Sequence, residues 1–246
     1  LALWDLAGKA AGKPVHELLG GPIKPDIPVY ASALHPVGAE KVQAEAKAYV
    51  KEGYQAMKMR FPYGPGHGID GMRANEEHVA NVRDAVGDDI EIMADAYMGW
   101  DFLYAKKMVK RLEPYRLAWL EEAFLPDDLN SYAKLRQETS IPISGGEHEY
   151  TRFGFQQIIE KQAMDIIQPD LRRCGGLSEG RRICSLALAN GITVIPHAYG
   201  PTHIHFALAE TAIPMIEYFP LPCWDDLPDA EVEPIFHDEP QPQNGR

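Results

Sequence analysis

The sequence has little of what marks several common classes of protein. Only three of its 246 residues are cysteine, and no pair has the C-x-x-C spacing, which argues against a disulfide framework or a structural zinc site. No run approaches the roughly 20 consecutive apolar residues of a membrane-spanning helix, so no membrane partner is expected. The first residues contain neither the basic stretch nor the cleavage site of a signal peptide. The cytoplasm is therefore the expected compartment.

Positive charge is also scarce. Lys and Arg number 24 against 36 Asp and Glu, which gives a formal net charge of −12. Because this excess repels phosphate backbones and anionic lipids, nucleic acid is not an expected partner. The same excess leaves carboxylates available to bind a cation.

Short apolar runs alternate with amphipathic stretches along most of the chain, and this alternation predicts an α/β fold with a parallel sheet. Eight such strands in about 250 residues indicate a closed barrel. An open doubly wound sheet is the alternative, which the lack of G-x-G-x-x-G after the first strand disfavours. The predicted strands are 27–33, 55–60, 90–95, 116–121, 141–145, 164–168, 192–196 and 214–218.

The two ends of the chain differ from this pattern. The sequence opens inside a predicted helix, LALWDLAGKAAGKPVHELLGG, and its last 25 residues hold five prolines and seven acids against one arginine. We therefore expect a barrel domain over 1–221, followed by an extended acidic, proline-rich segment over 222–246. We also expect the chain to be a fragment of a longer polypeptide.

Acidic residues occur where three consecutive predicted strands end. Asp95, Glu121 and Glu147 are separated by 26 residues each, which is one strand–helix unit. A barrel would bring them together at the face where active sites lie. Three converging carboxylates repel one another unless a cation lies between them, and oxygen ligands suit Mg²⁺. The alternative is a set of solvated surface acids.

The next strand ends carry Asp170, His197 and Glu217. Adjacent strands would bring Asp170 close enough to orient the His197 imidazole, which would make that histidine a general base near neutral pH. A structural histidine and a surface salt bridge of Glu217 are the alternatives.

Two cations lie on one face of the second predicted strand. Lys58 and Arg60 are two residues apart, so their side chains point the same way. We expect them to point into the barrel mouth and to pair with a substrate carboxylate or with the metal-binding acids. A pair of surface charges is the alternative.

Taken together, these residues resemble the enolase superfamily, mandelate racemase subgroup, over nearly the whole chain. The segments KMRFPYGPGHG, ISGGEHEYTRFGF and PMIEYFP resemble the L-rhamnonate dehydratase-like acid-sugar dehydratases within it. The resemblance implies a TIM-like modified (β/α)7β barrel, with the capping domain of that family absent from this chain. The motifs that carry it are Lys58-Met59-Arg60, Asp95-Ala96, Trp119-Leu120-Glu121-Glu122, Gly146-Glu147 and the pair Asp170 and His197.

The resemblance also implies roles for individual residues. Strand alternation alone does not separate Glu121 from Glu122 as a ligand, whereas the family uses the first of the pair. Ala123 follows them where the family commonly has proline, which loosens that loop without removing a ligand. The implied roles are Mg²⁺ ligands for Asp95, Glu121 and Glu147, a dyad for Asp170 and His197, a hydrogen-bond partner of the substrate carboxylate for Glu217, electrostatic contacts for Lys58 and Arg60, and a substrate contact for His148.

The function implied is Mg²⁺-dependent dehydration of a sugar acid, an aldonate such as L-rhamnonate, to a 2-keto-3-deoxy acid through an enolate. A homo-oligomer acting on a small molecule is expected. One alternative is a racemase or epimerase of a 2-hydroxy acid, which needs a second base; Arg60 is a poor base and Lys58 keeps this alternative open. Another is a non-catalytic barrel or an inactive fragment, which the complete set of site residues disfavours.

Overall fold

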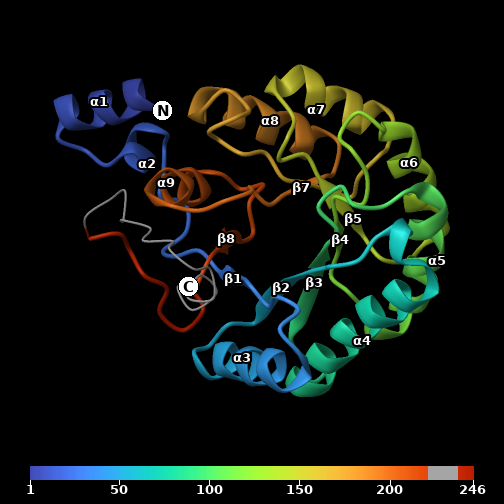
Figure 1. The fold of residues 1–246 in the computed structure, drawn as a ribbon. Helices are drawn as coiled ribbons and strands as arrows, with labels where there is room; N and C mark the ends of the chain where they lie inside the picture. The colour runs from blue at the N-terminus through green and yellow to red at the C-terminus, as the bar shows by residue number, and fades with distance from the viewer. Residues whose placement is uncertain (221–237) are drawn as a thin grey trace.

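The computed structural model describes residues 1–220 and 238–246, and its core is one curled sheet of eight parallel strands (Figure 1). Its strand order, β7-β6-β5-β4-β3-β2-β1-β8, follows the chain, whereas a doubly wound sheet reverses direction part-way. All eight predicted strands are confirmed, each shorter than expected. They are β1 (Val29–Ser32), β2 (Ala56–Arg60), β3 (Glu91–Asp95), β4 (Leu120–Glu121), β5 (Ile143–Gly145), β6 (Ile166–Ile167), β7 (Thr193–Val194) and β8 (Ile216–Tyr218).

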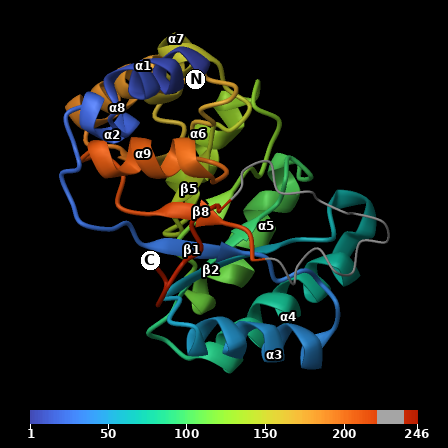
Figure 2. The ribbon, with the colours of Figure 1, turned by 90° about the vertical axis from the view of Figure 1, so that its left-hand side faces the viewer.

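A helix follows each strand from β1 to β7 and lies on the outer side of the sheet (Figures 1 and 2). This is the expected (β/α)7β arrangement, in which every crossover returns the chain to the same end of the sheet. The crossover helices are α3 (Ala39–Lys51), α4 (Gly68–Val86), α5 (Phe102–Leu112), α6 (Leu129–Glu138), α7 (Thr151–Glu160), α8 (Leu177–Ala189) and α9 (Pro201–Ala209), with short 3₁₀ turns at Pro65–His67 and Glu113–Tyr115.

Two of these helices begin at an aspartate whose carboxylate accepts a hydrogen bond from the first turn. Asp101 accepts from the amide of Tyr104 at 2.8 Å before α5, and Asp128 accepts from the amide of Ser131 at 3.1 Å before α6. Such caps satisfy backbone donors that have no partner inside the helix.

The segment predicted as one helix at the start of the chain forms two, α1 (Ala2–Ala11) and α2 (Val15–Leu18), because Gly12 ends α1 in the left-handed region and Pro14 is extended. They lie beside α8 and α9 on the outside of the barrel (Figure 2). The indole Nε1 of Trp4 donates to Ser178 Oγ on α8 at 2.9 Å, while Leu3 on α1 is 81% exposed. Within the described residues, no helix has the length and apolar character needed to cross a membrane.

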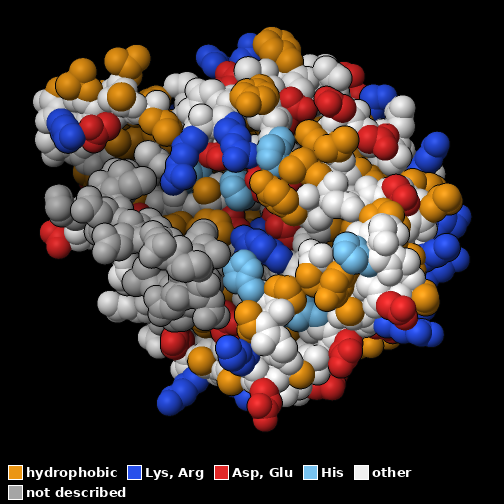
Figure 3. Space-filling model, in the orientation of Figure 1, with side chains coloured by type: hydrophobic (Ala, Val, Ile, Leu, Met, Phe, Trp, Pro, Cys, Tyr) orange, Lys and Arg blue, Asp and Glu red, His pale blue; other side chains and the backbone are white. Residues whose placement is uncertain are grey.

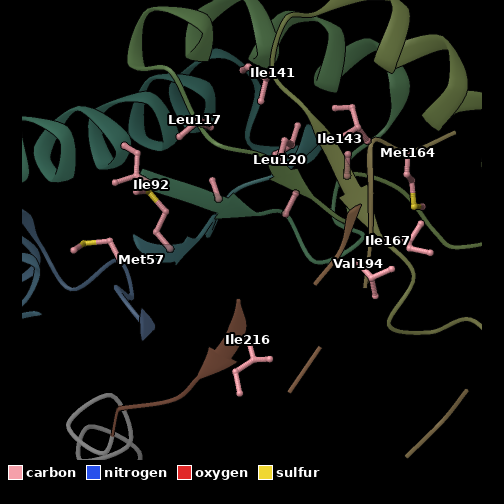
Figure 4. Close-up of a cluster of buried hydrophobic side chains, with 14 of the residues drawn as sticks. Met57, Ile92, Leu117, Leu120, Ile141, Ile143, Met164, Ile167, Val194 and Ile216 are labelled. Carbon is pink, nitrogen blue, oxygen red and sulfur yellow. The ribbon is translucent and has the colours of Figure 1, made fainter. Parts of the chain in front are cut away.

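Side chains alternate along the strands between two hydrophobic clusters. One lies between the sheet and the helices and includes Met57, Ile92, Leu120 and Ile143 (Figure 4). The other lies on the inner side of the barrel. It consists of Tyr30, Ala56, Met93, Trp119 and Ile195. Bulky side chains therefore fill part of the inside of the barrel, which is a packed core and not a channel.

The two ends of the ladder, β7 and β8, are not paired with each other within residues 1–220 and 238–246. The amide of Val194 on β7 instead donates to the carbonyl of Ala212, just before β8, at 3.2 Å. This bond joins the two ends of the curled sheet.

Residues 238–246 lie against the start of β1. The carbonyl of Gly245 accepts from the Val29 amide at 3.0 Å, and Arg246 forms an ion pair with Asp26. The predicted boundary between 1–221 and 222–246 falls on 221–237, outside the described residues, so this division stays a prediction.

The packing behind the sheet generates a stability prediction. Ile143, on β5, is fully buried between the sheet and the helices. Ile143→Ala therefore leaves a cavity and should lower the free energy of unfolding by about 2–5 kcal/mol, measured in urea titrations. Leu103→Ala is the control, because Leu103 is 70% exposed on α5 and its truncation should cost no more than about 0.5 kcal/mol. Equal costs for the two variants would contradict this description of the core.

Candidate active site

The carboxyl ends of the strands meet at one face of the barrel, where Lys, Arg, Asp, Glu and His side chains surround a hollow (Figure 3). The register of the sheet sets them level, since Arg60 on β2 pairs with Asp95 on β3 and Asp95 pairs with Glu121 on β4. The predicted strand-end residues therefore occupy one region of the molecule.

Several buried carboxyl groups gather there, among them Asp95, Glu121, Glu122 and Glu147. Burial and the neighbouring Glu121 raise the pKa of Asp95 to about 7. Burial, together with Glu147, Asp95 and Glu121, raises the pKa of Glu122 to about 9. The cluster is therefore short of positive charge.

Glu121 is held by three donors inside the barrel. Trp119 Nε1 and Gln168 Nε2 donate to its Oε2 at 2.9 and 2.8 Å, and Lys58 Nζ contacts its Oε1. All of these groups are almost completely buried. Glu121 is thus fixed in place: its Oε2 accepts two hydrogen bonds from the protein, and its Oε1 contacts the ammonium group of Lys58.

The donor set suits a hard divalent cation. Glu121, Glu147 and His197 each offer a ligand atom within 4.8 Å of the others, as do Glu122, Glu147 and His148. Among the described residues, Glu122 Oε2 is buried with no hydrogen-bond partner, as expected of a group that lacks a counter-charge. Asp95 belongs to neither group, so its place as a ligand stays a prediction.

His197 lies between two carboxylates. Its Nδ1 is 3.0 Å from Glu147 Oε2 and 3.1 Å from Glu217 Oε2, although neither contact has the direction of a hydrogen bond within the described residues. Burial on its own lowers the pKa of His197, but Glu147 and Glu217 outweigh it and raise the pKa to about 10. The imidazole is therefore a cation in this arrangement.

Asp170 lies differently from the expected dyad. Its Oδ1 accepts from the amide of Arg172 at 2.7 Å, and its Oδ2 is 3.6 Å from Arg173 Nε. Asp170 turns toward its own loop because those donors follow it directly, and it forms no hydrogen bond or ion pair with His197 in the described part of the chain. The pairing of Asp170 with His197 stays a prediction.

Glu217 and Lys58 form a second buried ion pair, with Lys58 Nζ 2.9 Å from Glu217 Oε1. Burial lowers the pKa of Lys58, but Glu121 and Glu217 raise it well above the usual value. Because Lys58 is 1% exposed, the alternative of a surface charge is wrong for this residue. Its partners are the barrel's own acids. The other oxygen of Glu217 accepts from the amide of Ala198 at 2.7 Å, which holds the turn after His197.

Arg60 and His148 lie at the entrance. Arg60 Nη2 donates to Ser32 Oγ at 3.3 Å, and its guanidinium lies over the ring of Phe219. His148 Nδ1 is 3.1 Å from Glu122 Oε1. The side chain of His148 is one quarter exposed, so it is accessible to solvent.

Three residues around the acids were given no role in the sequence analysis: Trp119, which was named only as part of a motif, Gln168 and Arg173. Trp119 and Gln168 lie two residues before Glu121 and Asp170, so strand alternation places each on the inner face with its neighbour. That alternation was a usable signal. Arg173 lies in a loop, and its contact with Glu147 has no periodic signature.

Residues 41–246 match the family described as enolase C-terminal domain-like. The chain belongs to this family. It is 37% identical to an L-rhamnonate dehydratase of Saccharopolyspora erythraea and 36% identical to a putative L-rhamnonate dehydratase of Caldivirga maquilingensis, each over the whole chain. It covers 61% and 60% of those proteins, so it spans about three fifths of the length of the curated relatives it matches.

Solved structures show the same similarity. L-rhamnonate dehydratase from Gibberella zeae superposes with a TM-score of 0.79 at 36% identity, over 89% of this chain and 53% of that one, and has also been crystallised in complex with Mg. The 3,6-anhydro-D-galactonate cycloisomerase of Zobellia galactanivorans superposes with a TM-score of 0.79 at 34% identity, over 89% of this chain and 61% of that one. Both structures share the chain's fold.

His203, on α9 behind this site, generates a pH prediction. Its ring is fully buried, both nitrogens lack hydrogen-bond partners in the described residues, and burial lowers its pKa to about 4. Between its ordinary value of 6.5 and about 4, the unfolded chain binds a proton that the folded chain refuses, so stability is lost as pH falls through this window.

His203→Leu removes this loss. From neutral pH to pH 4, the free energy of unfolding of the variant should rise relative to the wild type by roughly 3 kcal/mol, measured in denaturant titrations. A difference that stays constant over the pH series would mean that the ring is satisfied inside the fold.

Proposed function

We propose that this chain is the barrel of a Mg²⁺-dependent sugar-acid dehydratase, which converts an aldonate of the L-rhamnonate type to a 2-keto-3-deoxy acid. The observation that carries the proposal is the group of buried carboxyls beside His197 at the carboxyl ends of the strands. The names of the relatives support this chemistry. The substrate is a monocarboxylate with hydroxyls on C2 and C3.

Glu121 and Glu147, with Asp95, are the residues that would hold Mg²⁺. When bound, the ion supplies a Lewis acid that stabilises negative charge on the substrate carboxylate as the C2 proton leaves. The protein contributes rigidity, since Trp119, Gln168 and Lys58 fix the carboxylate of Glu121 before any substrate arrives.

His197 takes the C2 proton at Nε2, because its Nδ1 is turned toward Glu147 and Glu217. A charged imidazole cannot act as a base. The attraction of Glu147 for His197 weakens when that carboxylate binds a divalent cation, so the pKa of His197 falls and the neutral ring becomes available.

The C3 hydroxyl leaves with a proton as water, and the resulting enol tautomerises to the 2-keto-3-deoxy acid. Two histidines can donate that proton. His197 returns the one it has taken, whereas His148 reaches the hollow from the neighbouring loop with Nδ1 held by Glu122. Either route balances the reaction as loss of one water.

A racemase needs a base on each face of the enolate. Arg60 stays protonated, and Lys58 is buried in ion pairs with Glu121 and Glu217 that keep its ammonium charged. Both are poor bases, so the geometry favours elimination with a single base at C2.

Mg²⁺ binding can be tested directly. Glu147→Gln should weaken Mg²⁺ binding, measured by titration calorimetry, because it removes one charged ligand, and chelation should abolish the activity of the full-length protein until Mg²⁺ is restored. Glu160→Gln is the control, since Glu160 ends α7 away from the carboxyl cluster, and it should bind Mg²⁺ like the wild type. Unchanged binding in Glu147→Gln would remove Glu147 from the site.

The base can be tested by isotope exchange. His197→Asn should keep Mg²⁺ binding but lose dehydration, and exchange of the C2 proton with solvent deuterium, by at least about 10²–10⁴-fold. His16→Asn, on α2 at the outside of the barrel, is the matched control and should exchange normally. Wild-type exchange in His197→Asn would make another group, such as Lys58, the base and would favour the racemase.

A further inference from the structure

The loop between β5 and α7 carries two residues of the proposed site, Glu147 and His148. It is fastened to the next loop, which follows β6. Arg173 Nη1 donates to both the carbonyl and the Oε1 of Glu147 at 3.3 Å, and the amide of Thr151 donates to the carbonyl of Cys174 at 3.2 Å. The position of Glu147 therefore depends on contacts between two loops.

Thr151, at the end of this loop, is held in a strained conformation. Its φ is 57°, in the left-handed region that β-branched residues rarely adopt. Such a conformation costs on the order of 1–3 kcal/mol and persists only where neighbouring groups fix it. The contacts that hold this backbone conformation are therefore expected at the residues next to Thr151.

Glu179, on α8, supplies that restraint. Its Oε1 accepts from the amide of Arg152 at 2.9 Å, while Arg152 Nη1 donates to both carboxylate oxygens at 2.8 and 2.9 Å. Within the described residues, Tyr150 makes no side-chain cap for α7, so a carboxylate from a different helix caps it. Glu179 also accepts from Arg182 Nη1 at 2.8 Å on its own helix.

We infer that Glu179 is a positioning residue for Glu147 and His148. Its hydrogen bonds from the amide and Nη1 of Arg152 hold the end of the loop, and thereby fix the direction from which both side chains enter the site. The inference rests on the proposed function, because Mg²⁺ is the group that Glu147 would hold. Glu179 itself touches neither substrate nor metal.

The consequence is a remote effect on metal binding. Without Glu179, Arg152 has no partner on α8, Thr151 can relax toward the right-handed or extended region, and the chain between Gly146 and Thr151 gains freedom. Loss of an outer residue that orients a ligand weakens metal binding by about 10–100-fold.

Glu179→Ala tests this inference in the full-length protein. Alanine favours the helical conformation of α8. We expect Mg²⁺ affinity by calorimetry to fall about 10–100-fold, with faster amide hydrogen exchange over 146–153. Arg182→Ala is the matched control, because it removes the other partner of Glu179 and leaves Arg152 in place; both measurements should match the wild type. Arg152→Gln should reproduce Glu179→Ala even if the latter folds poorly.

The outcomes separate the two proposals. Wild-type affinity and exchange in both Glu179→Ala and Arg152→Gln would overturn the positioning role. Equal losses in Arg182→Ala would also overturn it, because the effect would then belong to α8 in general. If the wild type binds no Mg²⁺, or if the wild type and Glu147→Gln bind it with equal affinity, the proposed function is wrong. Amide hydrogen exchange over 146–153 then still decides whether Glu179 fixes the loop.

Discussion

Repulsion among carboxylates at one end of the barrel is the constraint on which the rest of the site depends. Asp95, Glu121, Glu122 and Glu147 lie together out of contact with bulk water, where like charges repel strongly. The fold tolerates them by surrounding them with buried or half-buried cations and fixed donors. Lys58, Arg173, His197 and Gln168 each contact one of these acids or its neighbours.

These partners divide the acids into two kinds. Glu121 is saturated by donors from three strands, whereas Glu122 keeps one oxygen without any hydrogen-bond partner in the described chain. A saturated carboxylate is rigid, and an unsatisfied one is open to a proton or a cation. The family resemblance implies that Glu121 is the metal ligand. Glu122 uses its Oε1 to contact His148 Nδ1, and it is the other oxygen, Oε2, that has no partner among the described residues.

Much of this could be read from the sequence, because strand alternation and the spacing of strand–helix units are periodic. Eight strands, and the positions of Asp95 and Glu121 at the ends of β3 and β4, follow from that periodicity. The backbone turns that follow the strands do not. Glu122 and Ala198 have positive φ values of 41° and 67°, so the chain turns there in ways that hydrophobic pattern does not encode. The strand spacing predicts that Asp170 faces His197, but its carboxylate accepts a hydrogen bond from the amide of Arg172. A nearby backbone donor thus competes with the distant histidine, and the spacing of strands does not tell which partner is chosen.

The order of strands in the sheet bears on how the site comes into being. Every neighbouring pair from β1 to β7 joins strands adjacent in the chain, so these contacts are local and can form early, whereas β1 with β8 is the one pairing in the described sheet that spans the length of the barrel. Lys58 on β2 and Glu217 on β8 meet only after that distant pairing is made. That ion pair therefore requires the barrel to close between its first and last strands, whereas Asp95 and Glu121 come together through the pairing of β3 with β4, which are neighbours in the chain.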